Sequence, residues 1–188
     1  MITYKDILKD TDPKVREKSR NVKLPLSDED RNTLLEMLQY IKDSVDEEKS
    51  EKYGLRPAVG LAAPQIGVMK KMFAMAILVE EEDGSYSFDE YAFVNPKIVS
   101  YSVQRAYLKD GEGCLSVEEE HRGFVPRAAR ITVKGYDVLQ DKEVEIRLRG
   151  YKAIVAQHEM DHFNGVLFYD HINKKNPFEE IPNAMVIE

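Results

Sequence analysis

The chain has 188 residues, of which 43% are hydrophobic and 32% are charged, and its 27 basic and 34 acidic side chains leave a formal net charge of −7. This balance is typical of a globular protein and excludes a disordered one, and the length predicts one domain over residues 1–188. No basic run interleaved with aromatic residues is present, which argues against direct nucleic-acid binding. The first residues lack a signal-peptide core, no apolar run could span a membrane as a helix, and the single cysteine fits a reducing compartment, so we expect a cytoplasmic protein.

The first predicted element is an amphipathic helix over roughly residues 29–46. Ser27 is a suitable N-cap, and acidic residues follow it in the first turn. Apolar residues then recur at helical spacing, at Leu34, Leu35, Leu38, Ile41 and Val45. The Gly/Ala-rich stretch from Val59 onward predicts a loop.

Strands are predicted in the second third of the chain. Residues 72–79 form an apolar run typical of a buried strand, and Asp83-Gly84 predicts a hairpin turn that returns through residues 91–94. Further strands are expected at 131–133 and 144–148, with a turn at 141–142. Gly150 then precedes a second helix, and Gly165 predicts its end. The order predicts an α+β fold in which antiparallel strands pack around one central helix.

The second helix carries the most informative pattern of the chain, His158-Glu159-Met160-Asp161-His162. Imidazoles four positions apart share one face of a helix and can bind one metal ion, while the glutamate stays free to move protons. The neighbouring residues are apolar, and a buried helix seldom carries such polar groups without partners. We therefore predict a metal-dependent hydrolase.

A third protein ligand is expected, because catalytic sites of this kind usually combine three ligands with one open position. Phe168 stands where one protease subclass has its third histidine, and it excludes that subclass. Glu179 and Glu180 lie in a proline-broken stretch and are weak candidates. Cys114 is the better one, since the glycines just before it indicate a tight backbone path or a close ligand approach. A thiolate with two imidazoles favours Fe(II) or Zn(II) over Mg(II) or Ca(II).

Three segments of the sequence resemble, in the same order, the signature motifs of the peptide deformylase family: Val59–Gln65 (VGLAAPQ), Glu112–Ser116 (EGCLS) and Gln157–His162 (QHEMDH). The resemblance extends over nearly the whole chain, and the insert-like segment 46–57 is similar to the longer, Gram-positive type. The family fold that it implies agrees with the predicted α+β order. One departure is Ala58, where the first motif usually has glycine. It is strained if the backbone needs a positive φ there, and nearly neutral if only a small side chain is needed.

The resemblance implies an enzyme that removes the N-terminal formyl group from N-formyl-methionyl peptides of newly made proteins and releases formate. It implies one divalent ion, natively Fe(II) with Zn, Ni or Co as alternatives, held by Cys114, His158 and His162. Glu159 would accept a proton from the attacking water and return it to the leaving amine. The donors implied for the developing oxyanion are the side-chain amide of Gln65 and the backbone N–H of Leu115.

The substrate would be aligned as an added strand by backbone groups of Val59, Gly60 and Gly113. Val155, one turn before the first histidine, would line the pocket for the methionine side chain, although plain core packing explains it equally well.

Five further residues have weaker claims to a role. Glu112 pairs with Arg127 in our prediction, either to brace the cysteine loop or as an ordinary surface salt bridge. Asp161 is expected to brace the helix through a basic partner. His121 and His171 lie in polar segments, and we expect them to be solvated.

Two other functions remain open from the residues alone. A zincin-type metalloprotease would cleave unformylated peptides and use a third ligand other than Cys114. A non-catalytic metal-binding module would have a closed site. Nascent chains on the ribosome are the partners that the resemblance suggests, and a monomer is the default expectation.

Overall fold

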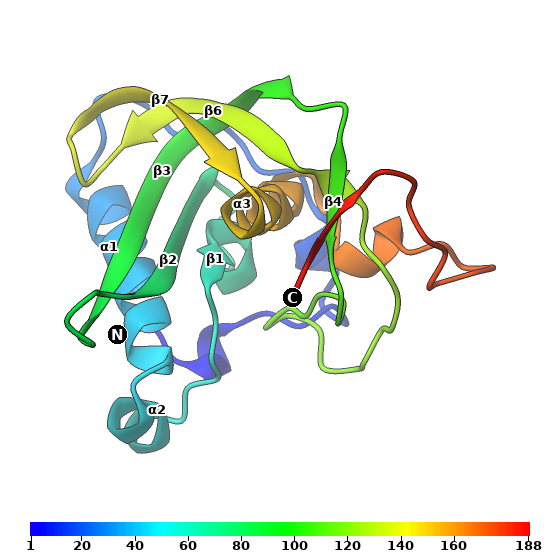
Figure 1. The fold of residues 1–188 in the computed structure, drawn as a ribbon. Helices are drawn as coiled ribbons and strands as arrows, with labels where there is room; N and C mark the ends of the chain where they lie inside the picture. The colour runs from blue at the N-terminus through cyan, green and yellow to red at the C-terminus, as the bar shows by residue number, and fades with distance from the viewer.

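The structure, a computed structural model that describes residues 1–188, is organised around a five-stranded antiparallel sheet with order β1-β2-β3-β6-β7 (Figure 1). Its strands are β1 (Gly60–Ala62), β2 (Met72–Glu80), β3 (Tyr86–Tyr101), β6 (Arg130–Asp137) and β7 (Lys142–Arg149). A second sheet has the order β5-β4-β8, with β4 (Arg105–Leu108), β5 (Arg127–Ala128) and β8 (Met185–Ile187). Among the strand pairs, only β4 and β8 run parallel.

Three α-helices complete the regular structure: α1 (Asp28–Ser44), α2 (Glu47–Tyr53) and α3 (Tyr151–Asp161). Five short 3₁₀ helices are also present: η1 (Tyr4–Asp6), η2 (Pro13–Arg16), η3 (Ala63–Ile66), η4 (His162–Asn164) and η5 (Phe168–His171). Helix α3 lies between the large sheet and the small one, and α1 covers the other face of the large sheet (Figure 1). The predicted α+β class with a central helix is confirmed. None of the helices combines the length and the apolar composition needed to cross a bilayer.

Strand β2 is apolar throughout its first half because both of its faces are buried. Met72, Ala74 and Ala76 belong to the core on the α1 side. Phe73 and Met75 alternate with them and belong to the core on the α3 side. Side chains of a strand alternate between the two faces of a sheet, so a continuous apolar run serves both layers. The predicted strand at 72–79 is therefore confirmed, and it is the element that joins the two cores.

Helix α1 begins where its sequence predicts. The Ser27 side chain accepts a hydrogen bond from the Asp30 N–H, and acidic residues occupy the first turn. Leu34, Leu38 and Ile41 are buried against the sheet, whereas Leu35 and Val45 are exposed. The helix ends at Ser44, two residues earlier than expected. Helix α2 follows within the insert-like segment, capped by Asp46 and ended by Gly54 at φ 61°, and it was not predicted.

The stretch from Val59 onward was expected to be a loop, and for residues 60–62 this expectation was wrong. These residues form β1, an edge strand paired with β2 through Gly60↔Met75 and Ala62↔Phe73. Three residues without alternating polarity give too short a pattern for a strand to be predicted, and here the pairing partner decides the structure. Ala58 is not among the residues with positive φ, which are Asn95, Asp141 and Asn183 besides glycines, so the possible backbone strain does not arise.

The remaining hairpins follow the prediction with longer strands. β3 continues over sixteen residues, far beyond the expected 91–94, and β6 and β7 contain the expected 131–133 and 144–148. Asp141 takes a positive φ of 53° at the turn between β6 and β7. The α-helix carrying the histidines ends at Asp161, and η4 continues the chain to Gly165 at φ 67°. Gly165, where the end of the helix was predicted, therefore ends the 3₁₀ helix η4 and not α3 itself.

Candidate active site

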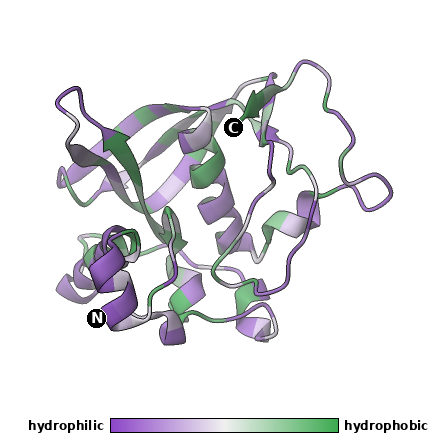
Figure 2. Ribbon diagram, turned by 60° about the horizontal axis from the view of Figure 1, so that its bottom comes forward, coloured by the Kyte–Doolittle hydropathy of each residue, from purple (hydrophilic) through white to green (hydrophobic).

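Helix α3 carries the polar residues of the site in its last turns, after an apolar middle section (Figure 2). Ala153, Ile154 and Ala156 fill the interior between the two sheets. His158 and Glu159 follow in the last turns, and His162 continues the same right-handed path at φ −58° and ψ −28°. Although η4 is a 3₁₀ helix, the two imidazoles thus remain close, with ring centroids 5.3 Å apart.

The loop between β4 and β5 brings Cys114 to these two rings. The ligand atoms of Cys114, His158 and His162 all lie within 4.8 Å of one another. The distance from Cys114 Sγ to His162 Nε2 is 3.5 Å. Sulfur and nitrogen ligands of one tetrahedral ion lie about 3.6 Å apart, given bond lengths of about 2.3 and 2.1 Å. The spacing and the donor chemistry of this group therefore fit a divalent metal ion. Glu179 and Glu180, the other candidates, are exposed and do not belong to the cluster.

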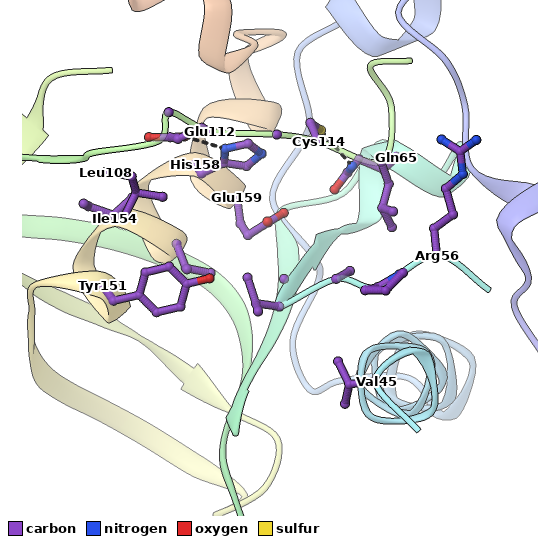
Figure 3. Close-up of a pocket in the computed structure, with 18 residues that line it drawn as sticks. Val45, Arg56, Gln65, Leu108, Glu112, Cys114, Tyr151, Ile154, His158 and Glu159 are labelled. Atoms are coloured by element: carbon purple, nitrogen blue, oxygen red, sulfur yellow. Dashed lines mark hydrogen bonds and ion pairs between the residues drawn. The ribbon is translucent and has the colours of Figure 1, made fainter. Parts of the chain in front are cut away.

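A buried ion-pair network holds the first histidine. Glu112 Oε1 accepts a hydrogen bond from His158 Nδ1 at 2.8 Å (Figure 3), which leaves the Nε2 lone pair available for a metal. Arg127 Nε and Nη2 donate to the same carboxylate at 2.7 and 2.9 Å. Both partners are only 3% exposed, so Glu112 and Arg127 are not a surface salt bridge. The alternative in which the pair braces the site is the one that the geometry supports.

The network continues to the outside of the helix. Asp161 Oδ2 accepts from Arg127 Nη1 at 2.9 Å and from His171 Nε2 at 2.8 Å. Asp161 thus has the basic partner that was expected, and His171 serves as a second one. His171 is nevertheless exposed, as expected, whereas His121 is half-buried because its ring stacks on Tyr169 with centroids 4.1 Å apart.

The electrostatics of the cluster favour a bound cation. Burial would lower the pKa of His158, but its hydrogen bonds with Cys114 and Glu112 outweigh burial and raise the pKa well above the usual value. Burial lowers the pKa of His162 well below the usual value, which keeps that ring neutral. Burial would raise the pKa of Glu112, but hydrogen bonds from His158 and Arg127 outweigh burial and lower this pKa to about 2. The hydrogen-bonding partners of the first ring thus favour a positive charge there.

Glu159 is buried beside the cluster without a hydrogen-bonding partner. Its Oε2 atom has none within the structure, and burial raises the pKa of the carboxyl to about 7. A divalent cation nearby would favour the ionised form. An orphaned carboxylate is costly, so such an atom indicates that a ligand, water or ion completes its surroundings. A Cβ added at Gly60 would lie 2.5 Å from Glu159 Oε1, so only glycine at this position of β1 leaves room for the carboxylate.

Gln65 is held so that its amide group faces the cysteine. Its Oε1 accepts from the Ala62 N–H at 2.9 Å. The amide nitrogen is therefore directed to the other side, where it donates to Cys114 Sγ at 3.4 Å (Figure 3). It also donates to Ser116 Oγ at 3.2 Å. The side chain is 2% exposed. This orientation is set by the backbone of the β1–η3 corner and does not depend on a ligand.

A cavity of about 470 Å³ opens at this cluster. Cys114, His158 and Glu159 form its polar end. Apolar side chains from β4 and α3 lie on one side of Glu159, whereas Val45 and Arg56 lie on the other (Figure 3). The first group includes Leu108, Tyr151 and Ile154, and Val155 of α3 also lines the cavity.

The residues predicted from the sequence are only some of those that line the cavity. The expected residues Val59, Gly60, Gly113, Leu115 and Val155 all line it. Val155 also belongs to the core on the α3 side and is 5% exposed, so it both packs in the core and borders the cavity, and its contact with a substrate stays a prediction. Leu108, Tyr151 and Ile154 also line the cavity and were not predicted from the sequence. Ile154 lies one turn before His158 and could have been found from that spacing, but Leu108 is placed by β4 and carries no local signal.

The sequence profile of the polypeptide deformylase family matches residues 4–178 of the chain. The chain belongs to the polypeptide deformylase family. It is 52% identical to peptide deformylase 2 of Bacillus subtilis strain 168 over 188 residues, which is the whole of both chains. It is 55% identical over 189 residues to peptide deformylase 2 of Bacillus cereus, again over both whole chains.

Solved deformylase structures share the fold. A class I type b peptide deformylase from Acinetobacter baumannii, crystallised with Met-Ala-Ser, is 27% identical, and the match covers 88% of this chain and 96% of that one with a TM-score of 0.67. Deformylases remove the N-formyl group of new peptides, a hydrolysis of a linear amide, and this chain is an enzyme of that family with that activity. Its Cys/His/His cluster is a site for a divalent metal ion. A general protease and a non-catalytic module are therefore excluded as its main function.

Proposed function

We propose that Cys114, His158 and His162 together ligate one divalent ion, natively Fe(II), with Zn, Ni or Co as possible substitutes. The observation that carries this proposal is the 3.5 Å contact between the thiol and the second ring, inside a cluster that also faces the first ring. A soft thiolate with two imidazoles favours Fe(II) or Zn(II), and the preference for iron follows from the family resemblance. When bound, the ion would supply Lewis acidity at the formyl carbonyl and lower the pKa of a water molecule.

Glu159 moves the proton in the proposed reaction. It accepts a proton from the attacking water, and it delivers that proton to the amine that leaves as the C–N bond breaks. The free Oε2 atom at the polar end of the cavity supports this role. The products are formate and a peptide with a free amino terminus.

Two donors stabilise the negative charge that develops on the formyl oxygen. One is Gln65 Nε2. The orientation of this amide is fixed because the Ala62 N–H donates a hydrogen bond to Gln65 Oε1. The other is the Leu115 N–H, which has no acceptor among the hydrogen bonds of the chain. Donors held in place before the reaction cost no reorganisation, and the loss of one typically costs roughly a hundredfold to a thousandfold in rate.

The peptide binds along β1, whose outer edge is unpaired because the strand ends the large sheet. Gly60 and Gly113, which both line the cavity, offer further backbone groups. The Val59 carbonyl already accepts from the Ala76 N–H at 3.0 Å, so the N–H of Val59 is its group for the substrate. The methionine side chain enters the apolar part of the cavity beside Val155, next to Tyr151 and Leu108.

The test is turnover of formyl-Met-Ala-Ser by protein that has been loaded anaerobically with Fe(II). We expect stoichiometric release of formate and of Met-Ala-Ser, and no cleavage of unformylated Met-Ala-Ser. A metal-loaded protein that releases no formate would refute the proposal.

A substitution at β1 tests the position of Glu159. Gly60→Ala should reduce kcat/KM for formyl-Met-Ala-Ser by roughly a hundredfold, because the new methyl group would displace the carboxylate and small misplacements cost about that much. Ala58→Gly is the matched control on the same segment and should change little, since residue 58 needs no positive φ. Equal rates for the two variants would contradict the proposed close packing of Glu159 against β1.

Four further proposals rest on the sequence and the substrate class. Residues 1–188 form one catalytic domain, which acts as a monomer. It works in the cytoplasm, where a single thiol ligand stays reduced. Its substrates are nascent chains as they leave the ribosome.

A further inference from the structure

The last strand of the chain, β8, forms the edge of the small sheet beside α3 (Figure 1). It pairs in parallel with β4, with Ala106↔Met185, Tyr107↔Val186 and Leu108↔Ile187 in register. The Lys109 N–H extends the pairing with a hydrogen bond of 2.9 Å to the Ile187 carbonyl. The strand is apolar along its length (Figure 2). This apolar strand packs behind residues that line the cavity.

The two faces of β8 have different surroundings. Met185 and Ile187 pack against a buried cluster formed by Ala106, Ala129 and Ile154. Ile187 reaches the start of α3, because a Cβ at Gly150 would lie 3.7 Å from its Cδ1 atom. Val186 points to the opposite face and is 47% exposed. Ile187 therefore supports the helix, and Val186 does not.

The residues that Ile187 supports are also part of the cavity wall. Leu108 is its register partner on β4, and Ile154 belongs to the cluster on which it packs. Both residues line the cavity on the side of Glu159 that also holds Tyr151 (Figure 3). The wall is thus one layer thick, with β8 on one side of it and the cavity on the other. A close-packed wall transmits a loss of volume on one side to the other.

We propose that Ile187 is a positioning residue for substrate selection. It holds Leu108 and Ile154 in place, and thereby fixes the width of the pocket that takes the formyl-methionine side chain. This inference rests on the proposed assignment of that pocket to the methionine.

The experiment compares Ile187→Ala with Val186→Ala in the full-length, metal-loaded enzyme. For Ile187→Ala we expect the KM for formyl-Met-Ala-Ser to rise roughly threefold to tenfold while kcat stays within about twofold, because binding is weakened and the catalytic groups are untouched. The preference for formyl-Met-Ala-Ser over formyl-Phe-Ala-Ser, as a ratio of kcat/KM values, should fall about tenfold, since a wider pocket tolerates the bulkier ring.

Two controls separate this role from a general loss of stability. Val186→Ala removes methyl groups from the same strand but faces away from α3, and it should keep the wild-type KM and preference. Ile187→Val keeps most of the packing volume and should restore both. Thermal unfolding and metal content, measured on every variant, ensure that folded and loaded enzyme is compared.

The outcomes are distinct. If wild-type enzyme releases formate and the two alanine variants behave alike in KM and in substrate preference, Ile187 has no positioning role. A fall in kcat alone for Ile187→Ala, with preference unchanged, would also overturn the inference. Absence of formate release by the wild-type enzyme would instead refute the proposed function itself.

Discussion

Glu159→Gln removes nearly all formate release while the metal stays bound. The amide has the same shape as the carboxyl group and fits the space beside Gly60, but it cannot accept a proton from water. General acid–base catalysis by one side chain typically contributes roughly a hundredfold to ten-thousandfold, so we expect kcat to fall by that amount. The measurement is formate release per metal-loaded site, with metal content determined on the same sample.

The control for this variant is Glu119→Gln, the same chemical change at an exposed residue of an acidic run. It should have wild-type kcat and metal content. Wild-type turnover in Glu159→Gln would show that another group moves the proton. Loss of the metal in that variant would mean that the carboxylate is itself a ligand.

Cys114→Ser weakens metal binding. A neutral hydroxyl replaces a thiolate that contributes the only negative charge among the three donors, and it is a harder and poorer ligand for Fe(II) or Zn(II). Changes in residues that merely orient ligands typically cost tenfold to a hundredfold in metal affinity, so the loss of a ligand should cost at least about a hundredfold. Competition with a chelator of known affinity measures this directly.

Ser116→Ala is the companion variant on the same loop. Ser116 is fully buried and accepts a hydrogen bond from Gln65, but it does not belong to the cluster of ligand atoms. Its loss should leave metal affinity unchanged. Equal affinities for wild-type enzyme and Cys114→Ser would remove the cysteine from the ligand set.

The longest elements could be predicted from the sequence because their patterns were long and consistent. Helix α1 carries both a capping serine and apolar residues at helical spacing, and β2 carries an apolar run that both cores require. Shorter elements could not be predicted in the same way. β1, β5 and β8 have three residues or fewer, and their conformation is decided by strands far away in the sequence. Helix α2 did have readable signals, an Asp46 cap and a terminal Gly54, which lay inside a segment interpreted only as an insertion.

The residues of the site, too, were predictable only where a local pattern carries them. The two histidines and Glu159 follow from local spacing on one helix, which sequence shows directly. The residues that surround them come from other elements. Glu112 is brought to His158 by the loop after β4, whereas only its pairing with Arg127 was predicted from the sequence. The space that Gly60 leaves for Glu159 depends on how β1 approaches α3, which no sequence pattern contains.

The central claim is that the thiol of Cys114 and two imidazoles bind the same ion. X-ray absorption at the metal edge of the anaerobically loaded wild-type enzyme measures this most directly. For a zinc-loaded sample we predict one sulfur neighbour at about 2.3 Å and nitrogen or oxygen neighbours at about 2.0–2.1 Å. A spectrum with no sulfur neighbour would contradict the claim.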